Sequence, residues 1–202
     1  MEFIKGELFH IYNRGNNRDK IFYSRRNYLF FLEKINTYIS PYGELIAWCL
    51  LPNHFHLMVY IKDVELIVPS TDPLANSERV GVKKRTLNQS IGIMLRSYTN
   101  AIKKQEGRTG ALFQEETKAV LLKESLTFTP SYFNTAFGTK INTLNEDKSY
   151  AENCFNYIHS NPVSSGLVKT AGDWEFSSYC DYVGLRNGKL INKDRGKEFL
   201  VP

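Results

Sequence analysis

The clearest pattern of apolar and polar positions lies between residues 45 and 61. An apolar run over Leu45–Leu50 leads into a Leu-Pro-Asn break, and apolar residues then recur at every second position as far as Ile61. This pattern predicts two β-strands joined by a tight connection. Because side chains alternate between the faces of a strand, one face of the second strand is apolar and the other carries His54 and His56 side by side.

Alternation upstream of this hairpin and helical spacing on both sides predict the neighbouring elements. Residues 8–15 indicate a strand with His10, Tyr12 and Arg14 on one face. Ser24 is a suitable N-cap for a first helix, because apolar side chains recur at helical spacing after it.

A second helix is predicted from Thr86 to about Gly107, with Tyr98 in its apolar stripe. A further strand is expected over residues 118–123.

The third predicted helix begins at a capping-box signature, in which Ser149 and Glu152 satisfy each other's exposed amide groups. It should end near Asn161, because Pro162 disfavours helical geometry in the residue before it. Tyr157 and Asn161 are four residues apart, so a phenol and an amide should project together from one edge of this helix.

Two stretches interrupt the periodic pattern. Residues 62–85 end in a cluster of basic side chains and indicate a solvent-exposed basic loop, and residues 125–147 are interpreted as an insertion. We expect one domain over residues 1–185, followed by a basic C-terminal tail over residues 186–202 with little apolar surface to bury.

Composition narrows the class of protein. The 202 residues are 42% hydrophobic and 13% aromatic, as in globular proteins, and the formal charge of +5 favours a polyanionic partner. Three scattered cysteines form no Cys-x-x-Cys pair, which argues against a disulfide framework and a thiolate zinc site. No leader sequence and no apolar run of membrane length is visible, so we expect a soluble cytoplasmic protein that does not bind membranes.

The spacing of His54 and His56 would let both imidazoles reach one metal ion. A pair of this kind can equally be a surface feature or a satisfied part of a core. A catalytic metal site needs about three protein ligands, so a third ligand and a reacting group are required.

Tyr157 is the better candidate for the reacting group. Its rival Tyr98 lies within an apolar stripe, which argues for a place in the core, whereas Tyr157 borders the stripe of its helix. His159 lies about 200° round the helix from Tyr157 and should point away from it. The alternative is that Tyr157 is a half-buried structural tyrosine.

Three motifs together resemble the single-tyrosine HUH transposases, in particular the REP-associated tyrosine transposases. They are His10–Gly15, Ala47–Leu57 and Tyr157–Val163, and the resemblance extends from about Leu8 to Tyr182. It implies an α+β fold, a ferredoxin-like antiparallel β-sheet with packed α-helices, in the order strand, helix, hairpin, helix, strand, helix.

The resemblance also implies the roles of individual residues. His54 and His56 would bind a divalent metal ion, Mg²⁺ or Mn²⁺, and Tyr157 would attack single-stranded DNA near a hairpin to form a 5′-phosphotyrosine. Insertion transposases of this group usually have Gln as a metal ligand four residues after the tyrosine. Asn161 stands at that position here, as in the REP-associated branch, and its shorter side chain would contact the metal directly or through water.

The expected activity is metal-dependent nicking and joining of DNA, and hence DNA transposition, by a monomer or a homodimer. Two alternatives remain: a hairpin-binding protein of the same fold without cleavage, and a structural metal-binding domain that leaves Tyr157 and Asn161 unexplained. The basic side chains expected to bind DNA are Arg14, Arg18, Lys83, Lys84, Arg85, Lys103, Lys104 and Arg108.

Overall fold

The computed structural model describes residues 2–69, 82–123, 132–135, 138–141 and 149–200. Its centre is a four-stranded antiparallel sheet with the strand order β2-β3-β1-β6. The strands are β1 (Leu8–Arg14), β2 (Gly43–Leu51), β3 (His54–Ile61) and β6 (Lys118–Leu121). The predicted hairpin (β2 and β3) and the strands predicted over residues 8–15 and 118–123 (β1 and β6) are therefore confirmed.

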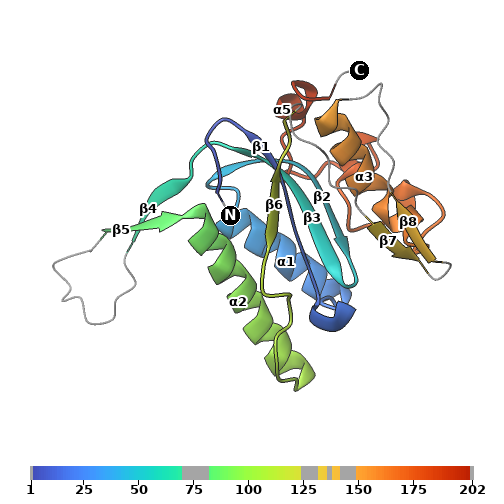
Figure 1. The fold of residues 1–202 in the computed structure, drawn as a ribbon, viewed down its shortest axis with the longest axis horizontal. Coiled ribbons are helices and arrows are strands. Elements are labelled where there is room, and N and C mark those ends of the chain that lie inside the picture. The colour runs from blue at the N-terminus through green and yellow to red at the C-terminus, as the bar shows by residue number, and fades with distance from the viewer. Residues whose placement is uncertain (1, 70–81, 124–131, 136–137, 142–148, 201–202) are drawn as a thin grey trace.

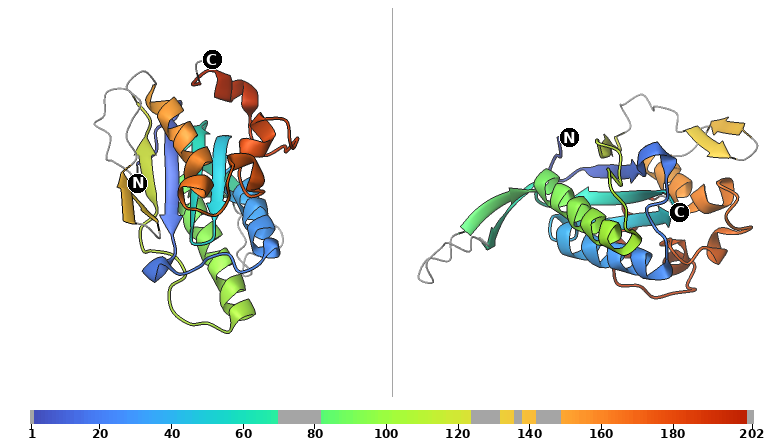
Figure 2. Two further views of the ribbon diagram at one scale, coloured as in Figure 1. Left: turned by 90° about the vertical axis from the view of Figure 1, so that its right-hand side faces the viewer. Right: turned by 90° about the horizontal axis from the view of Figure 1, so that it is seen from below.

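Helices cover both faces of this sheet (Figures 1 and 2). On one face lie α1 (Arg25–Tyr38) and α2 (Leu87–Glu106), and on the other lies α3 (Tyr150–Ser164). The architecture is the predicted α+β class, an antiparallel sheet with packed helices.

The alternation of β3 determines which face carries which chemistry. Phe55, Leu57 and Val59 are fully buried against α1 and α2. Burying one such side chain contributes roughly 1.5–3 kcal/mol. Because these apolar residues hold one face in the core, His54 and His56 are directed to the face that α3 covers.

The helix starts follow the predicted capping signals. Side-chain and backbone groups form reciprocal capping boxes at Ser24, Thr86 and Ser149. The predicted end of the third helix near Asn161 is wrong, because α3 continues through Pro162 to Ser164. Proline removes one donor from the helix, but the next turn still forms, with the Ser165 amide donating to the Asn161 carbonyl over 2.9 Å.

The segment predicted as a basic loop over residues 62–85 contains regular structure at both ends. β4 (Glu65–Pro69) pairs antiparallel with β5 (Val82–Thr86), and residues 70–81 between them lie outside the described residues. The predicted insertion over residues 125–147 lies largely outside them too, apart from the paired strands β7 (Tyr132–Thr135) and β8 (Gly138–Ile141).

The last segment is more deeply packed than its composition indicates. It contains the short helices α4 (Tyr179–Tyr182) and α5 (Lys193–Lys197). Ile191 is buried, and the amide of Asn192 donates to the carbonyl of Leu45 in β2 over 2.8 Å. The expectation that residues after 186 have little apolar surface to bury is therefore wrong, because this segment packs against the edge of β2.

In the described part of the chain, every helix is too short or too polar to cross a membrane.

Candidate active site

The two histidines of β3 lie at the start of the strand, beneath α3. Their ring centroids are 5.0 Å apart and the ring planes are nearly perpendicular, at 88°. His56 is buried and His54 is half-buried. Their common face follows from the alternation of the strand, so the sequence was sufficient to place them together.

Tyr157 and Asn161 project from α3 onto these histidines. The ring of Tyr157 meets that of His56 edge to face, with centroids 5.2 Å apart. The Asn161 side chain is fully buried, and its Nδ2 lies 3.1 Å from Nε2 of His56. The structure thus brings the four predicted side chains into one cluster, while their chemical roles remain predictions.

Tyr98 and His159, which the sequence predicted to lie outside this cluster, do lie outside it. Tyr98 is completely buried among α1 and α2, and its hydroxyl donates to the carbonyl of Ile21 over 2.7 Å. His159 points away from Tyr157, and its Nε2 lies 2.7 Å from Oγ of Ser178.

His10, for which the sequence pattern predicted no role, completes the cluster. Its Nε2 lies 2.9 Å from Nδ1 of His56, and the two rings stack with centroids 5.1 Å apart. The polar face of residues 8–15 was visible in the sequence. The strand register that pairs Tyr12 with His56, and so makes His10 a diagonal neighbour of His56, was not.

Burial keeps these imidazoles neutral at neutral pH. Desolvation lowers the pKa of His10 to about 3 and that of His54 to about 4. It also lowers the pKa of His56 well below the usual value, and repulsion from the positive charge of Arg14 lowers it further. A neutral imidazole is the form that binds a metal ion.

The donor set fits a divalent ion with nitrogen and oxygen ligands. No group of three His, Cys, Asp or Glu side chains that could hold a metal ion occurs among the residues that the structure describes. A third protein ligand beside His54 and His56 would therefore be the Asn161 amide. Its oxygen accepts a hydrogen bond from Ser165 Oγ over 3.2 Å, and this hydroxyl can accept from the amide nitrogen instead if the amide turns.

Several of the predicted DNA-binding residues surround the end of the sheet that carries His54. Arg14 lies directly opposite His54 in the strand ladder. Arg18 is exposed in the short turn that follows β1, where its carbonyl accepts from the Asn53 amide. Arg108 donates to Asp19 and to the hydroxyl of Tyr23, which fixes the end of α2 beside the same turn. Lys103 and Lys104 occupy the last turn of α2.

The structure does not bring Lys83, Lys84 and Arg85 to this place. They lie on β5, before the first residue of α2, and Lys84 forms an ion pair with Glu65 of β4 at 2.9 Å. α2 has 20 residues, so about 30 Å separates its two ends. Figure 1 shows β4 and β5 projecting on the side away from α3.

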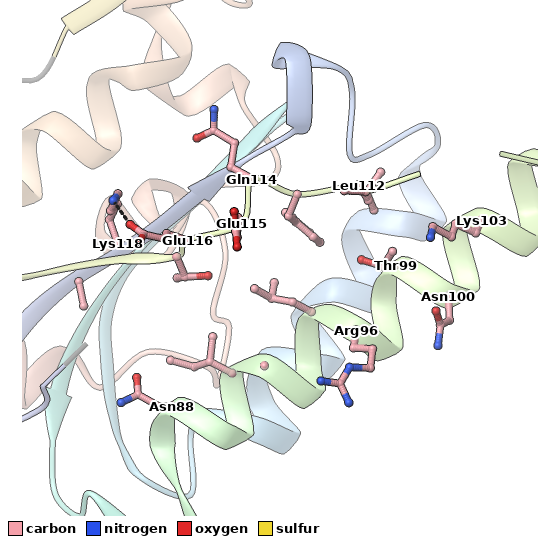
Figure 3. Close-up of a pocket in the computed structure, with 17 residues that line it drawn as sticks. Asn88, Arg96, Thr99, Asn100, Lys103, Leu112, Gln114, Glu115, Glu116 and Lys118 are labelled. Atoms are coloured by element: carbon pink, nitrogen blue, oxygen red, sulfur yellow. Dashed lines mark hydrogen bonds and ion pairs between the residues drawn. The ribbon is translucent and has the colours of Figure 1, made fainter. Parts of the chain in front are cut away.

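A separate groove of about 900 Å³ lies between α2 and residues 111–119 (Figure 3). Arg96 and Lys103 line it, but so do Glu115 and Glu116, and Glu116 pairs with Lys118. Leu112 and Ile91 belong to the core formed with α1 and α2, so this groove is on the face opposite the histidines. Its mixed charge does not by itself indicate a ligand.

Fold and cluster together define an α+β protein in which two imidazoles, an amide and a tyrosine share one face of an antiparallel sheet. A solved structure with this fold is described as a REP-associated tyrosine transposase bound to a REP hairpin. The two chains superpose with a TM-score of 0.56 and 19% sequence identity, over 96% of this chain and 87% of the other. No family model and no curated protein matches the sequence. The fold expected from the sequence motifs is therefore confirmed, and the activity is a matter for proposal.

Proposed function

We propose that this protein is a metal-dependent transposase that nicks and rejoins single-stranded DNA near a hairpin through a phosphotyrosine intermediate. The observation that carries this proposal is the placement of Tyr157 and Asn161, one helical turn apart, against His56. The shared fold with a tyrosine transposase bound to a hairpin supports the same class of activity.

Tyr157 is the nucleophile in this proposal. Its Oη attacks the scissile phosphorus and forms a tyrosine–phosphate bond, while the bond from phosphorus to the 3′ oxygen breaks. The proton of the phenol ends on the released 3′-hydroxyl, and the 5′-phosphate stays on Tyr157. The phosphodiester is conserved in the covalent link, so the reverse attack by a 3′-hydroxyl rejoins DNA without a nucleotide cofactor.

His54, His56 and Asn161 would hold the metal ion, Mn²⁺ or Mg²⁺. When bound, a divalent ion there would offset negative charge that develops on the scissile phosphate. Arg14, which lies opposite His54 in the strand ladder, would contact the DNA backbone next to the same phosphate. The edge-to-face contact with His56 holds the ring of Tyr157 over the cluster.

The deciding experiment is a strand-specific cleavage assay with labelled single-stranded DNA that carries a hairpin, in the presence of Mn²⁺. Wild-type protein should give a covalent protein–DNA adduct that Tyr157→Phe lacks. The Tyr157→Phe protein should still bind the hairpin within a few fold of wild type. Tyr98→Phe, the matched control, should retain the adduct, and the opposite result would assign the nucleophile to Tyr98.

The second candidate is a DNA-hairpin binding protein without cleavage activity. It is favoured by one observation: Asn161 Nδ2 lies within hydrogen-bond distance of His56 Nε2, a pairing that satisfies the histidine without a metal. The same assay separates the two functions, because tight hairpin binding without any adduct in wild-type protein would support this candidate.

A further inference from the structure

His10 occupies a position that the proposed chemistry does not use. It is a buried polar side chain, 8% exposed, on the inner strand β1, beside His56 and edge to face with Tyr157. Its Nε2 faces Nδ1 of His56 at 2.9 Å, whereas Asn161 faces the other nitrogen of His56, Nε2, at 3.1 Å. Both ring nitrogens of His56 are thus engaged, one by each neighbour.

A neutral imidazole has one proton to share between two nitrogens. If the amide of Asn161 donates to Nε2 of His56, that nitrogen is an acceptor and the proton of His56 is on Nδ1. Nδ1–H can then donate only to Nε2 of His10, which must carry its own proton on Nδ1. The donors and acceptors of the three side chains alternate consistently along this series.

In the opposite arrangement the proton of His56 is on Nε2. The amide of Asn161 must then turn, so that Nε2–H of His56 donates to the amide oxygen of Asn161. The lone pair of Nε2 is then unavailable. A metal ion on the side of His56 that faces α3 requires the first arrangement, with the proton of His56 on Nδ1. Only in this arrangement does Nε2 have a free lone pair once the amide of Asn161 moves away.

We propose that His10 is a positioning residue that fixes the proton of His56 on Nδ1 and thereby presents Nε2 to a divalent metal ion. This inference rests on the proposed function in one respect, the role of His56 as a ligand. Histidine ligands commonly donate their second ring N–H to an acceptor that orients the ring, and loss of such an acceptor typically lowers metal affinity 10- to 100-fold.

The geometry separates this role from that of a ligand. His10 Nε2 approaches the nitrogen of His56 on the side of β1, and Asn161 approaches the nitrogen on the side of α3. One metal ion cannot take the place of both contacts. The planes of the His10 and His56 rings are only 27° apart, so a hydrogen bond between their nitrogens can lie close to both ring planes.

The first test reads the tautomer directly, in metal-free protein labelled with ¹⁵N-histidine. The nitrogen chemical shifts of His56 should show a protonated Nδ1 and an unprotonated Nε2. In His10→Phe, which keeps a flat ring but has no acceptor, the population should move toward the Nε2–H form. His10→Gln retains an amide oxygen as acceptor and should restore the Nδ1–H form. An Nε2–H tautomer in wild-type protein would overturn the proposal.

The second test measures Mn²⁺ binding by calorimetry, with Mn²⁺ alone as the probe. His10→Phe should bind 10- to 100-fold more weakly than wild type, and His10→Gln within a few fold. Unchanged affinity and tautomer in His10→Phe would overturn the proposal. If that variant does not fold, the wild-type tautomer and the His10→Gln protein still decide. If wild-type protein binds no Mn²⁺, the metal-dependent function fails, and the tautomer measurement separately decides whether His10 orients His56.

Discussion

At the scale of single residues, tyrosines with the same chemistry occupy opposite environments. Burial raises the pKa of Tyr98, whose hydroxyl is committed to the carbonyl of Ile21. Tyr157 is half-buried on the side of α3 that faces the rings of His10 and His56. A phenol that must meet DNA has to reach the surface, and of these two only Tyr157 does.

Removing the hydroxyl of Tyr98 should therefore affect stability rather than activity. Tyr98→Phe leaves the buried carbonyl of Ile21 without its donor, so the free energy of unfolding should fall by about 1–3 kcal/mol. Urea unfolding measures this change. Tyr38→Phe is the matched control, because the structure records no hydrogen bond of the Tyr38 hydroxyl to the described residues, and it should change stability by less than about 0.5 kcal/mol. Equal effects in both variants would contradict the argument.

At the scale of elements, the C-terminal segment contains two ion pairs: a buried one that joins α4 to the residues after it, and a half-buried one that joins α5 to β2. Asp181 in α4 is 2% exposed and accepts two hydrogen bonds from Arg186, of 2.8 and 2.6 Å. These bonds and the Arg186 charge lower the pKa of Asp181 against the opposing effect of burial. Arg195 bonds Glu44 at 2.9 Å in a more exposed position.

The two arginines should differ in what their removal costs. Arg186→Ala leaves the carboxylate of Asp181 buried and unpaired, so the free energy of unfolding should fall by about 3–5 kcal/mol. Arg195→Ala breaks a pair near the surface and should cost about 0–1 kcal/mol. Denaturant unfolding compares the two. A smaller loss for Arg186→Ala than for Arg195→Ala would show that the buried pair is not what holds the segment.

The packing of this segment also reverses an expectation about truncation. A polar tail could be removed with little effect on folding, but removal of residues 186–202 would take away Ile191 and the partner of Asp181. Loss of DNA binding in such a truncated protein would therefore not identify a DNA contact. Single substitutions at exposed basic positions are the appropriate test.

At the scale of the whole molecule, basic groups gather at two distant ends of α2. Arg14 and Arg18 belong to the end near His54, and Lys83 to the β4–β5 hairpin before the other end of α2, whose 20 residues span about 30 Å. Contacts to phosphate release counterions, so each contributes to the salt dependence of binding wherever it lies. Only contacts near the scissile phosphate should affect the chemical step.

Hairpin DNA long enough to reach both the His54 end of the sheet and the β4–β5 hairpin should distinguish basic residues that only bind DNA from those that also affect cleavage. Replacing Lys83, Lys84 and Arg85 by Ala should make the plot of log affinity against log salt shallower, by roughly 2–3 units if all three contact phosphates. The rate of adduct formation at saturating DNA should stay unchanged. Arg14→Ala should make the salt dependence shallower and should also lower the rate of adduct formation. An unchanged salt slope in the triple variant would mean that its three charges are only solvated.

Buried neutral histidines also make the stability of the whole protein depend on pH. In the unfolded chain His10 and His159 titrate near 6.5, whereas burial lowers the pKa of each to about 3 in the folded protein. Between these values the unfolded chain binds more protons than the folded protein. The stabilising contribution of the neutral histidines is therefore complete above pH 6.5, and the free energy of unfolding falls as the pH decreases below this value. Denaturant unfolding at pH 7 and pH 5 should show the loss before the carboxylates titrate, and equal stability at the two values would contradict it.

The alternation of residues 54–61, the capping signals and the polar edge of the third helix determined the sheet, the helix starts and the common face of Tyr157 and Asn161. These features are local, because faces and caps depend on residues within one or two turns. Only the tertiary structure placed Asn161 against His56, His10 behind it, and the C-terminal segment on β2, since strand register and packing join residues more than 40 positions apart. It also decided that Pro162 lies inside α3, because burial and the bonds of the following turn outweigh a local preference.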